Sequence, residues 1–560
     1  MPRLSGRHAM IEQLLAEGTK YVFGNPGTTE QAFIDALQDY TQLEYILSLQ
    51  EAVATCVADG YARASGRPAF LQLHIMPGLG NAMGMLYNSY RTGTPLVVYA
   101  GQHQQRGSSQ EPILAGDLVR LAEPVSKWAA EAQDAAEVPV LLRRAFKDAA
   151  QPTRGPVFVS IPANVMDEEA DVEIWPSNRI EHRTRPAPET TDRLARIFAE
   201  AKSPVIIAGD GVSISGGQAE LVQLAEATGA RVLTSFAAEL PFPSKHPLYA
   251  GLLAVVSASM LRGQLAMADL VVIVGAPVLT LLFPLDEPPF PPNAKVVHID
   301  DDLRELGKNW TLDLGVLADP RLAMADVLEA LRRVQTDDQR KEAKDRVAKV
   351  TSGGDAMMQA LDASARAKWD ASPMNAGRMM SEIADAMAPD TVLFDEAITS
   401  GGYLTRYLRF DDTGRHYRTT GGGLGPGMPA PIGIKLARPD KPVLSIVGDG
   451  AALYTIQALW TAAHHKIPVT WVIANNRSYR ILKLNMLDYL GEGAAGRKFV
   501  AMDMTDPELD FSKIASSFGV KGVRIEHPDE IGDAVREAQS SNEPRLLDVV
   551  IDGDVKSRWL

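Results

Sequence analysis

The sequence predicts an α/β protein built from three doubly wound parallel-sheet domains. Short runs rich in strand-forming residues alternate with helical patterns, which is typical of a parallel sheet covered by helices. This alternation occurs in three blocks that are separated by polar stretches. The 560 residues also exceed what a single hydrophobic core normally accommodates.

The first block predicts a domain over residues 1–180. Its expected strands are KYVFG, YILSL, AFLQLH, PLVVYAG and PVFVSIP. The polar stretch NRIEHRTRPAPE that follows is interpreted as a linker because it is rich in proline and arginine.

The second and third blocks predict domains over residues 190–335 and 374–560. The second has the expected strands SPVIIAGDG, ARVLTSF, DLVVIVGAP and AKVVHID, and then the charged stretch QTDDQRKEAKDR, an exposed helix or linker. The third has TVLFDE, PVLSIVGDG, PVTWVIANN and RLLDVVID.

Composition restricts the classes of partner. The formal net charge of -14 disfavours nucleic acid or an anionic membrane surface. The single cysteine, Cys56, excludes an intrachain disulfide framework and fits a reducing compartment. The longest apolar run, Leu270 to Leu285, is too short for a membrane span and is interrupted by glycine and proline. These features predict a cytoplasmic protein.

Two polar motifs follow neighbouring apolar runs in the third block. Gly448-Asp449-Gly450 ends one expected strand, and the asparagine pair with Asn476 ends the next. Ligands of such sheets bind beyond the carboxyl ends of the strands, so we expect the two motifs at one rim. Carboxylate and amide oxygens suit Mg²⁺, and the helix that begins near Ala451 favours phosphate at its N-terminus. The pattern predicts a metal-bridged diphosphate site.

The sequence contains an internal control for this prediction. A second GDG, at Gly209 to Gly211, also ends an apolar run. Asn476 lies 27 positions after Asp449, and the same step from Asp210 reaches Ala237, whose side chain cannot ligate a metal. We therefore interpret the first GDG as a structural turn.

The spacing GDG-x₂₄-NN resembles the cofactor motif of the thiamine-diphosphate enzymes, and the resemblance extends over nearly the whole chain. It is strongest to the benzoylformate decarboxylases. It is carried by FGNPGTTE, SLQEA, ADGYARASGRPAF, LHIMPGLGNAMG, TPLVVYAGQ, GPVFVSIP, VGAPV and GGGLGPGMPAPIG. It implies a pyrimidine-binding, a central and a diphosphate-binding domain in this order, with thiamine diphosphate and Mg²⁺ as cofactors.

The resemblance implies roles for individual residues at the cofactor. Asp449, the Asn476 side chain and the Ser478 carbonyl would bind Mg²⁺, and Leu424 would lie beneath the cofactor. The other expected cofactor contacts are Asn25, Pro26, Gly27, Thr399, Gly422, Gly423, Gly450, Ala451 and Tyr479.

Three residues are expected to be catalytic by resemblance. Glu51 would contact the aminopyrimidine ring, where a carboxylate stabilises the protonated ring nitrogen and so promotes proton transfer. His74 would transfer protons near the substrate, which suits an imidazole at physiological pH. Thr28 lies where the family has a serine that binds the substrate carboxylate. We also expect Thr28 or Thr29 to cap the following helix. His103 is a secondary candidate.

The sequence departs from the family around the substrate. Leu282 lies where the benzoylformate decarboxylases have a second catalytic histidine, and leucine cannot donate a proton. Arg480 and Lys483 follow NN and would suit a substrate with an extra anionic group if either points inward. The other residues expected at the pocket are Ile113, Leu114, Ile398, Ile481, Leu482 and Asn485.

The leading functional hypothesis is non-oxidative decarboxylation of a 2-oxo acid. The alternative is a carboligase or acyloin lyase, similar to acetolactate synthase or benzaldehyde lyase, on the same scaffold. A catalytically inactive scaffold protein is disfavoured because Glu51, Asp449 and Asn476 are intact. The resemblance further implies a homo-oligomer, at least a dimer and expected to be a tetramer, with active sites at the dimer interface. The acyl substrate and the pathway are not specified by the sequence.

Overall fold

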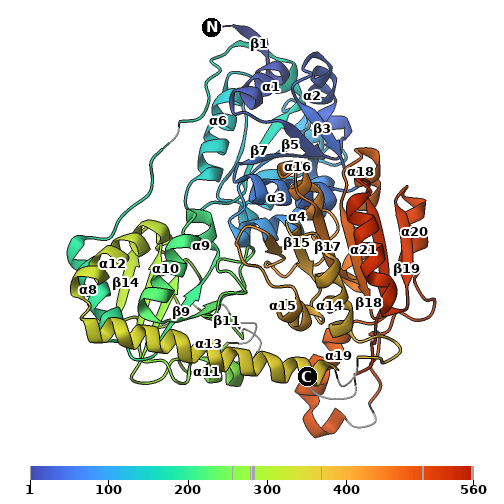
Figure 1. Ribbon diagram of the computed structural model, residues 1–560. Helices are drawn as coiled ribbons and strands as arrows, with labels where there is room; N and C mark the ends of the chain where they lie inside the picture. The colour runs from blue at the N-terminus through green and yellow to red at the C-terminus, as the bar shows by residue number, and fades with distance from the viewer. Residues whose placement is uncertain are drawn as a thin grey trace. The chain divides into compact units, whose positions relative to one another are not determined.

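The computed structural model describes residues 2–178, 180–254, 257–277, 279, 284–366, 369–494 and 497–555 (Figure 1). The chain forms two compact units. Unit 1 contains Met1–Ile180, Asp370–Tyr403 and Thr419–Leu560, and unit 2 contains Glu181–Trp369 and Leu404–Arg418. The exact limits of the three domains expected from the sequence stay a prediction.

Parallel sheets form the centre of both units, which confirms the α/β fold class with three doubly wound sheets. The first sheet of unit 1 has the order β3 (Glu44–Leu47), β2 (Tyr21–Gly24), β4 (Ala69–Leu73), β5 (Leu96–Gln102), β7 (Val157–Pro162) and β6 (Ala129–Glu131). The other sheet of unit 1 contains β15 (Val392–Glu396), β17 (Val443–Gly448), β18 (Thr470–Asn475), β20 (Arg545–Val550) and β19 (Lys521–Ile525) in this order.

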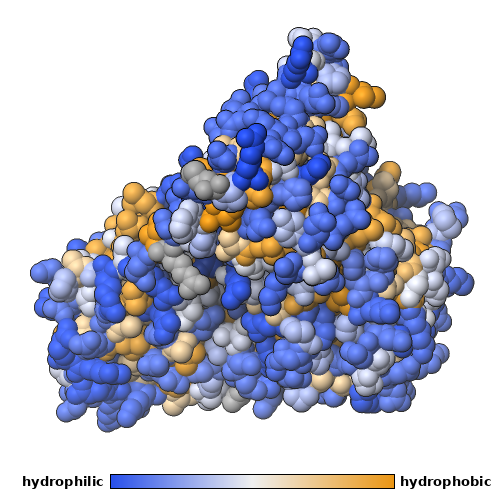
Figure 2. Space-filling model, turned by 90° about the horizontal axis from the view of Figure 1, so that it is seen from above, coloured by the Kyte–Doolittle hydropathy of each residue, from blue (hydrophilic) through white to orange (hydrophobic). Residues whose placement is uncertain are grey.

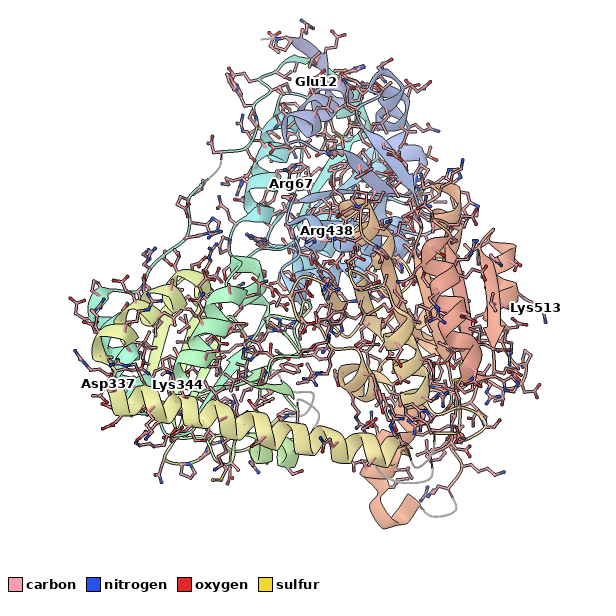
Figure 3. The ribbon with its side chains drawn as sticks, viewed as in Figure 1. Glu12, Arg67, Asp337, Lys344, Arg438 and Lys513 are labelled. Carbon is pink, nitrogen blue, oxygen red and sulfur yellow. The ribbon has the colours of Figure 1, made fainter. Side chains whose placement is uncertain are left out.

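The sheet of unit 2 contains β11 (Tyr249–Leu252), β10 (Arg231–Thr234), β9 (Pro204–Ala208), β12 (Leu270–Val274), β13 (Lys295–Asp300) and β14 (Leu314–Leu317) in this order. Its helices are α8 (Pro188–Glu200), α9 (Asp210–Ser215), α10 (Gln218–Thr228), α11 (Ala258–Leu265), α12 (Pro320–Val334) and α13 (Asp337–Arg366). The charged stretch after α12 is thus part of a helix, α13, on which Figure 3 labels Asp337 and Lys344.

Helices connect the strands of unit 1. Around its first sheet they are α1 (Gly6–Ala16), α2 (Gln31–Ala36), α3 (Glu51–Ser65), α4 (Ile75–Thr92), α5 (Leu118–Ala122), α6 (Glu137–Ala150) and α7 (Ala163–Asp167). In the C-terminal part of the chain they are α14 (Ala376–Ala386), α16 (Ala430–Ala437), α17 (Asp449–Ala452), α18 (Ala458–His464), α19 (Arg480–Leu490), α20 (Phe511–Ser517) and α21 (Ile531–Ser540). The residues of α15 (Gly401–Tyr407) are divided between unit 1 and unit 2.

The two sheets of unit 1 are joined by close packing of α3 against α16 (Figure 1). A Cβ atom on Gly60 would lie 2.1 Å from the Ala430 carbonyl oxygen, and one on Gly433 would lie 1.9 Å from that of Val57. Both glycines are therefore needed for the two helix backbones to touch. Arg438, labelled in Figure 3, donates Nε to the carbonyl oxygen of Ala64 at 3.0 Å across the same contact.

The surface is mainly polar. Figure 2 shows hydrophilic residues over much of the visible face, with hydrophobic residues among them. Within the described part of the chain, no helix is both long and apolar enough to cross a membrane.

Candidate active site

The two polar motifs lie side by side at the carboxyl ends of neighbouring strands. β17 and β18 are parallel, with Gly448 opposite Ala474, so the strands end at the same level. Asp449 begins α17 and is buried. Its Oδ1 accepts a hydrogen bond from Gly450 N at 2.8 Å, and its Oδ2 accepts one from Arg477 N at 2.5 Å. The expected convergence of the GDG and NN turns is confirmed by this contact.

The two asparagines that end β18 have different surroundings. Asn476 borders the pocket beside Asp449, and its Oδ1 accepts a hydrogen bond from Ser478 N at 3.0 Å. Asn475 instead donates Nδ2 to Oδ1 of Asp548 at 2.8 Å, inside the sheet. Successive residues of a strand point to opposite faces, so only one of the pair can reach the rim.

The turn after Asn476 is held by a hydrogen bond from Ser478 and by the packing of the Tyr479 ring. Ser478 is buried, and its Oγ donates to the Met502 carbonyl oxygen at 2.9 Å. The Tyr479 ring lies over Gly450, where a Cβ atom would come within 2.6 Å of Cε1. Gly450 therefore allows the aromatic ring and the start of α17 to pack directly together.

The oxygen atoms of this turn fit a magnesium ion. Burial raises the pKa of Asp449 to about 6, although hydrogen bonds from backbone N–H groups act to lower it. A cation beside the carboxylate would offset the cost of burying its charge. Among the described residues, no group of three or more His, Cys, Asp or Glu side chains is placed to hold a metal. Asp449, Asn476 and a backbone carbonyl are nevertheless the hard oxygen ligands that Mg²⁺ accepts.

A pocket opens at this rim. Among the described residues, its lining comes from strand ends of the second sheet of unit 1, the adjoining loops and the starts of α17 and α19: Glu396, Ala397, Ile398, Thr399, Ser400, Leu424, Gly448, Asp449, Gly450, Ala451, Ala474, Asn476, Ser478, Tyr479, Arg480 and Ile481. The cofactor residues expected in the C-terminal block thus surround one cavity, except for the two glycines before Leu424. Gly422 has a φ of 96° and leaves open space at its Cα, while Gly423 exchanges hydrogen bonds with the Asn88 side chain.

Glu396 is a pocket residue that the sequence reasoning missed. It is the last residue of β15, and its two carboxylate oxygens accept hydrogen bonds from Gly425 N and Gly427 N, each at 2.7 Å. Burial raises the pKa of Glu396 to about 8. These bonds fix the loop that carries Leu424. A carboxylate at the end of the strand TVLFDE was the available signal, because strand ends of this sheet form the rim.

The other expected catalytic residues lie at the rim of the first sheet of unit 1. Glu51 begins α3, is buried, and accepts a hydrogen bond from Asn81 Nδ2 at 3.0 Å. Asn25 donates Nδ2 to the Ser48 carbonyl oxygen at 2.8 Å and so ties the NPG turn to the segment before Glu51. Neither Glu51 nor Asn25 lines the pocket described above.

His74 is held by a buried carboxylate. The histidine follows β4 and precedes α4, and its Nδ1 lies 2.9 Å from Oε2 of Glu30, whose side chain is fully buried. Oε1 of Glu30 accepts hydrogen bonds from Gly101 N at 2.9 Å and Thr29 Oγ1 at 2.7 Å. A Cβ atom on Gly27 would lie 1.8 Å from His74 Nδ1, so the glycine of the NPG turn packs on the imidazole. Glu30, directly after NPGTT, is the second residue that was missed.

Thr28 is exposed at the start of a short 3₁₀-helix, and Pro26 beside it is exposed as well. The expectation that Thr28 or Thr29 caps the next helix is wrong: neither the 3₁₀-helix nor α2 has a side-chain cap. The N-cap positions belong to Gly27 and Glu30, and the Thr29 hydroxyl donates to Oε1 of Glu30. His103 is similarly engaged, since its Nε2 lies 2.6 Å from the Ile113 carbonyl oxygen.

Only some of the residues expected at the substrate pocket line the cavity. Ile398 and Ile481 line the cavity, whereas Leu482 and Asn485 are exposed and do not line it. Ile113 is 85% exposed and Leu114 37% exposed, both on a loop after the first sheet's β5. Leu282 lies outside the described residues.

The two basic residues after NN differ in their roles. Lys483 is buried in an ion pair with Asp503 and lies 5.7 Å from the centre of the Phe499 ring. Arg480 lines the pocket, and its Nε donates to the Asp554 carbonyl oxygen at 3.3 Å.

The carboxylate of the first GDG also accepts a hydrogen bond from the backbone after the following strand, but this turn lacks the asparagine. Asp210 accepts hydrogen bonds from Ala238 N at 2.7 Å and 3.0 Å and from Glu239 N at 3.1 Å. Asp210 and Ala238 are 28 positions apart, as are Asp449 and Arg477. The carboxylate of the first GDG therefore supports its turn, and Ala237 offers no oxygen where the other turn has Asn476.

Models of one enzyme family match most of the chain. The thiamine pyrophosphate enzyme N-terminal TPP binding domain matches residues 4–119, the central domain 191–331 and the C-terminal TPP binding domain 399–549. The chain belongs to the thiamine pyrophosphate enzymes. Thiamine pyrophosphate is another name for thiamine diphosphate, so the family implied by the sequence is confirmed.

Relatives within the thiamine pyrophosphate enzymes are similar along their whole length. The chain is 31% identical to a probable acetolactate synthase large subunit of Methanocaldococcus jannaschii, over 98% of this chain and 92% of that protein. It is 30% identical to benzoylformate decarboxylase of Pseudomonas aeruginosa, over 97% and 98% of the two chains. The structure of a thiamine diphosphate-dependent 4-hydroxybenzoylformate decarboxylase of Rhodococcus jostii has a TM-score of 0.84 and 27% identity, over 98% and 100% of the two chains.

Proposed function

We propose that this thiamine pyrophosphate enzyme catalyses the non-oxidative decarboxylation of a 2-oxo acid, with Mg²⁺ as its metal. The observation that carries the proposal is the contact between His74 and the buried Glu30, packed on Gly27. This contact orients His74, which lies at the same rim of the first sheet of unit 1 as Glu51. Similarity to benzoylformate decarboxylase over nearly the whole chain supports the same reaction.

The rim of β17 and β18 would hold the cofactor. Asp449, the Asn476 side chain and the Ser478 carbonyl would bind Mg²⁺, and Gly450 and Ala451 would face the diphosphate. The bound cofactor supplies an electron sink for the electron pair released with CO₂. Leu424, on the loop fixed by Glu396, would support it from below. Glu51 would hold a proton at the aminopyrimidine ring, with Asn81 orienting its carboxylate.

His74 would move a proton at the substrate. Glu30 holds Nδ1, so Nε2 is the nitrogen that remains for the reactants. The carboxylate favours a proton on Nδ1, because it accepts a hydrogen bond there. Nε2 would then be the basic nitrogen of the neutral ring, and protonated histidine would donate from this atom. Thr28, exposed beside this pair, would bind the substrate carboxylate.

We infer that a second copy of the chain completes each active site. Homo-oligomers are typical of the thiamine pyrophosphate enzymes, and the pocket lacks any lining residue from the part of the chain that carries Glu51. Exposed apolar side chains lie in both sequence regions that carry expected site residues: Leu49 two positions before Glu51, and Ile398 in the lining of the pocket. A dimer would bury such side chains, and a tetramer of two dimers is the expected assembly. A cytoplasmic location stays a prediction.

Arg480 supports a substrate that carries a second anionic group. It brings a positive charge to a pocket that the apolar side chains Ile398 and Ile481 also line. A guanidinium binds carboxylate, sulfonate or phosphonate groups through paired N–H donors.

A carboligase or acyloin lyase is the second candidate function. Leu282 at the position of the second histidine removes a proton donor, so that an acceptor aldehyde would compete with protonation and an acyloin would form. Similarity to acetolactate synthase at the same level of identity supports this alternative equally.

The test is a panel of aromatic, aliphatic and dianionic 2-oxo acids with Mg²⁺ and thiamine diphosphate, followed by CO₂ detection and product identification with and without an acceptor aldehyde. The proposal predicts CO₂ and the free aldehyde. Release of CO₂ with only acyloin products would favour the carboligase, and no CO₂ from any acid would reject decarboxylation.

A further inference from the structure

Asn475 is anchored on the side of β18 that faces away from the pocket. It is almost fully buried, and its Nδ2 donates to Oδ1 of Asp548 at 2.8 Å. Asp548 lies on the neighbouring strand β20, opposite Ile473, and is fully buried. Burying a carboxylate inside a sheet costs free energy unless its oxygens are hydrogen-bonded. The partners of Asp548 therefore decide whether this residue is tolerated at its position.

Asp548 connects three segments. Its Oδ1 accepts the hydrogen bond from Asn475, and its Oδ2 accepts one from Phe511 N, at the start of α20, at 3.1 Å. The guanidinium of Arg524, on β19, lies 3.7 Å from the same oxygen. Burial raises the pKa of Asp548, and the contacts with Asn475 and Arg524 oppose this change.

Arg524 extends the network to the other side of the turn. It donates to Oε1 of Glu508 at 2.5 Å, and the same oxygen lies 4.0 Å from Arg477 Nη1. Arg477 has a φ of 55°, in a region that non-glycine residues rarely adopt. Its carbonyl oxygen accepts a hydrogen bond from Met504 N at 2.9 Å. Both chain neighbours of Asn476 are therefore held by one polar network.

We propose that Asp548 is a positioning residue for the metal-binding turn: through Asn475 it fixes the end of β18 and thereby directs Asn476 and Ser478 toward the metal. The inference rests on the proposed function, because it takes these two residues as metal ligands. Partners that orient metal ligands typically change metal affinity by about 10- to 100-fold when they are lost.

The decisive variant is Asn475→Asp, which places two carboxylates side by side where a donor faces an acceptor. We measure Mn²⁺ binding by electron paramagnetic resonance, with saturating thiamine diphosphate, and record the unfolding temperature of the metal-free protein. The dissociation constant for Mn²⁺ should rise about tenfold or more. In the double variant Asn475→Asp/Asp548→Asn, the new amide at 548 donates to the new carboxylate and its oxygen accepts from Phe511 N. Affinity should return close to that of the unchanged protein.

Glu526→Gln is the matched control, because Glu526 also binds Arg524, at 3.0 Å, but does not touch the turn. Its Mn²⁺ affinity should be unchanged. If Asn475→Asp does not fold, Asn475→Ala removes the amide without adding charge and should weaken Mn²⁺ binding in the same direction.

Unchanged Mn²⁺ affinity in a folded Asn475 variant, even with a lower unfolding temperature, would show that Asp548 only stabilises the sheet. A folded double variant without recovered affinity would also overturn the inference. Failure of the unchanged protein to bind Mn²⁺ with the cofactor would instead reject the proposed function on which the inference rests.

Discussion

The replacement Glu30→Gln tests whether a buried carboxylate sets the proton position on His74. Glutamine keeps an oxygen for Thr29 Oγ1 and Gly101 N, which contact Oε1. Its amide group then takes the place of Oε2, 2.9 Å from His74 Nδ1. The imidazole must therefore accept a hydrogen bond at Nδ1 and carry its proton on Nε2. The fold is preserved, while the basic nitrogen moves away from the reactants.

The size of the effect follows from the lost contact. A hydrogen bond to a charged group contributes about 1.5–3 kcal/mol. If this energy orients His74 in the transition state, kcat/KM falls about 10- to 150-fold. The loss should be mainly in kcat, because the carboxylate touches His74 and not the substrate pocket.

Two assays separate orientation from stability. The ¹⁵N shifts of the His74 ring report the tautomer in the cofactor-free protein, and CO₂ release from the best 2-oxo acid reports catalysis. Glu226→Gln is the matched control, because Glu226 pairs with His246 at 3.2 Å in unit 2, where its carboxylate is mostly exposed. It should leave turnover unchanged. An unchanged His74 tautomer together with unchanged kcat in Glu30→Gln would refute the assigned role.

Three further predictions concern other carboxylates and the pocket. Glu51→Gln should lower turnover by about 10²- to 10⁴-fold while the unfolding temperature is retained, and turnover like that of the unchanged protein would reject its role as proton carrier. Glu396→Gln should change how the free energy of unfolding depends on pH. Glu396 has a pKa of about 8 in the folded protein and of 4.5 in the unfolded chain. The unchanged protein should therefore lose stability relative to the variant as the pH rises from 4.5 to about 8. The decrease is at most about 1.4 kcal/mol per pH unit, and a flat difference in urea midpoints would contradict it. Arg480→Ala should lower kcat/KM about tenfold for 2-oxo acids with a second anionic group, with little change for singly charged acids, and equal losses would show that Arg480 does not select the substrate.

The cofactor rim could be predicted from the sequence because its signals are local. Asp449 and Asn476 each follow an apolar run, and parallel neighbouring strands end at one level. The same rule placed His74 at a strand end, whereas Glu51 was expected from the family resemblance alone. The rule did not reveal that the partner of His74 Nδ1 is Glu30, because that contact joins residues 44 positions apart in the chain.

The edge strands β6 and β19 were not expected from the sequence, for a different reason. The strand β19 alternates exposed and partly buried residues, and β6 is only three residues long, so neither has an apolar run. Both lie at sheet edges, where one side of the strand has no neighbour in the sheet. The opposite directions of Asn475 and Asn476 could have been expected from the two-residue period of a strand. The buried partner Asp548 could not, since it lies 73 positions further along the chain.

The central claim is that the turn at Asp449, and not a GDG turn in general, binds the cofactor and its metal. The most direct measurement is calorimetric titration of thiamine diphosphate with Mg²⁺ into three proteins: unchanged, Asp449→Asn and Asp210→Asn. The two variants make the same change at aspartates that both accept a hydrogen bond from a backbone N–H 28 positions further along the chain. The account predicts that only Asp449→Asn weakens binding, by about 100-fold or more, while Asp210→Asn binds like the unchanged protein. Unchanged binding in Asp449→Asn would contradict it.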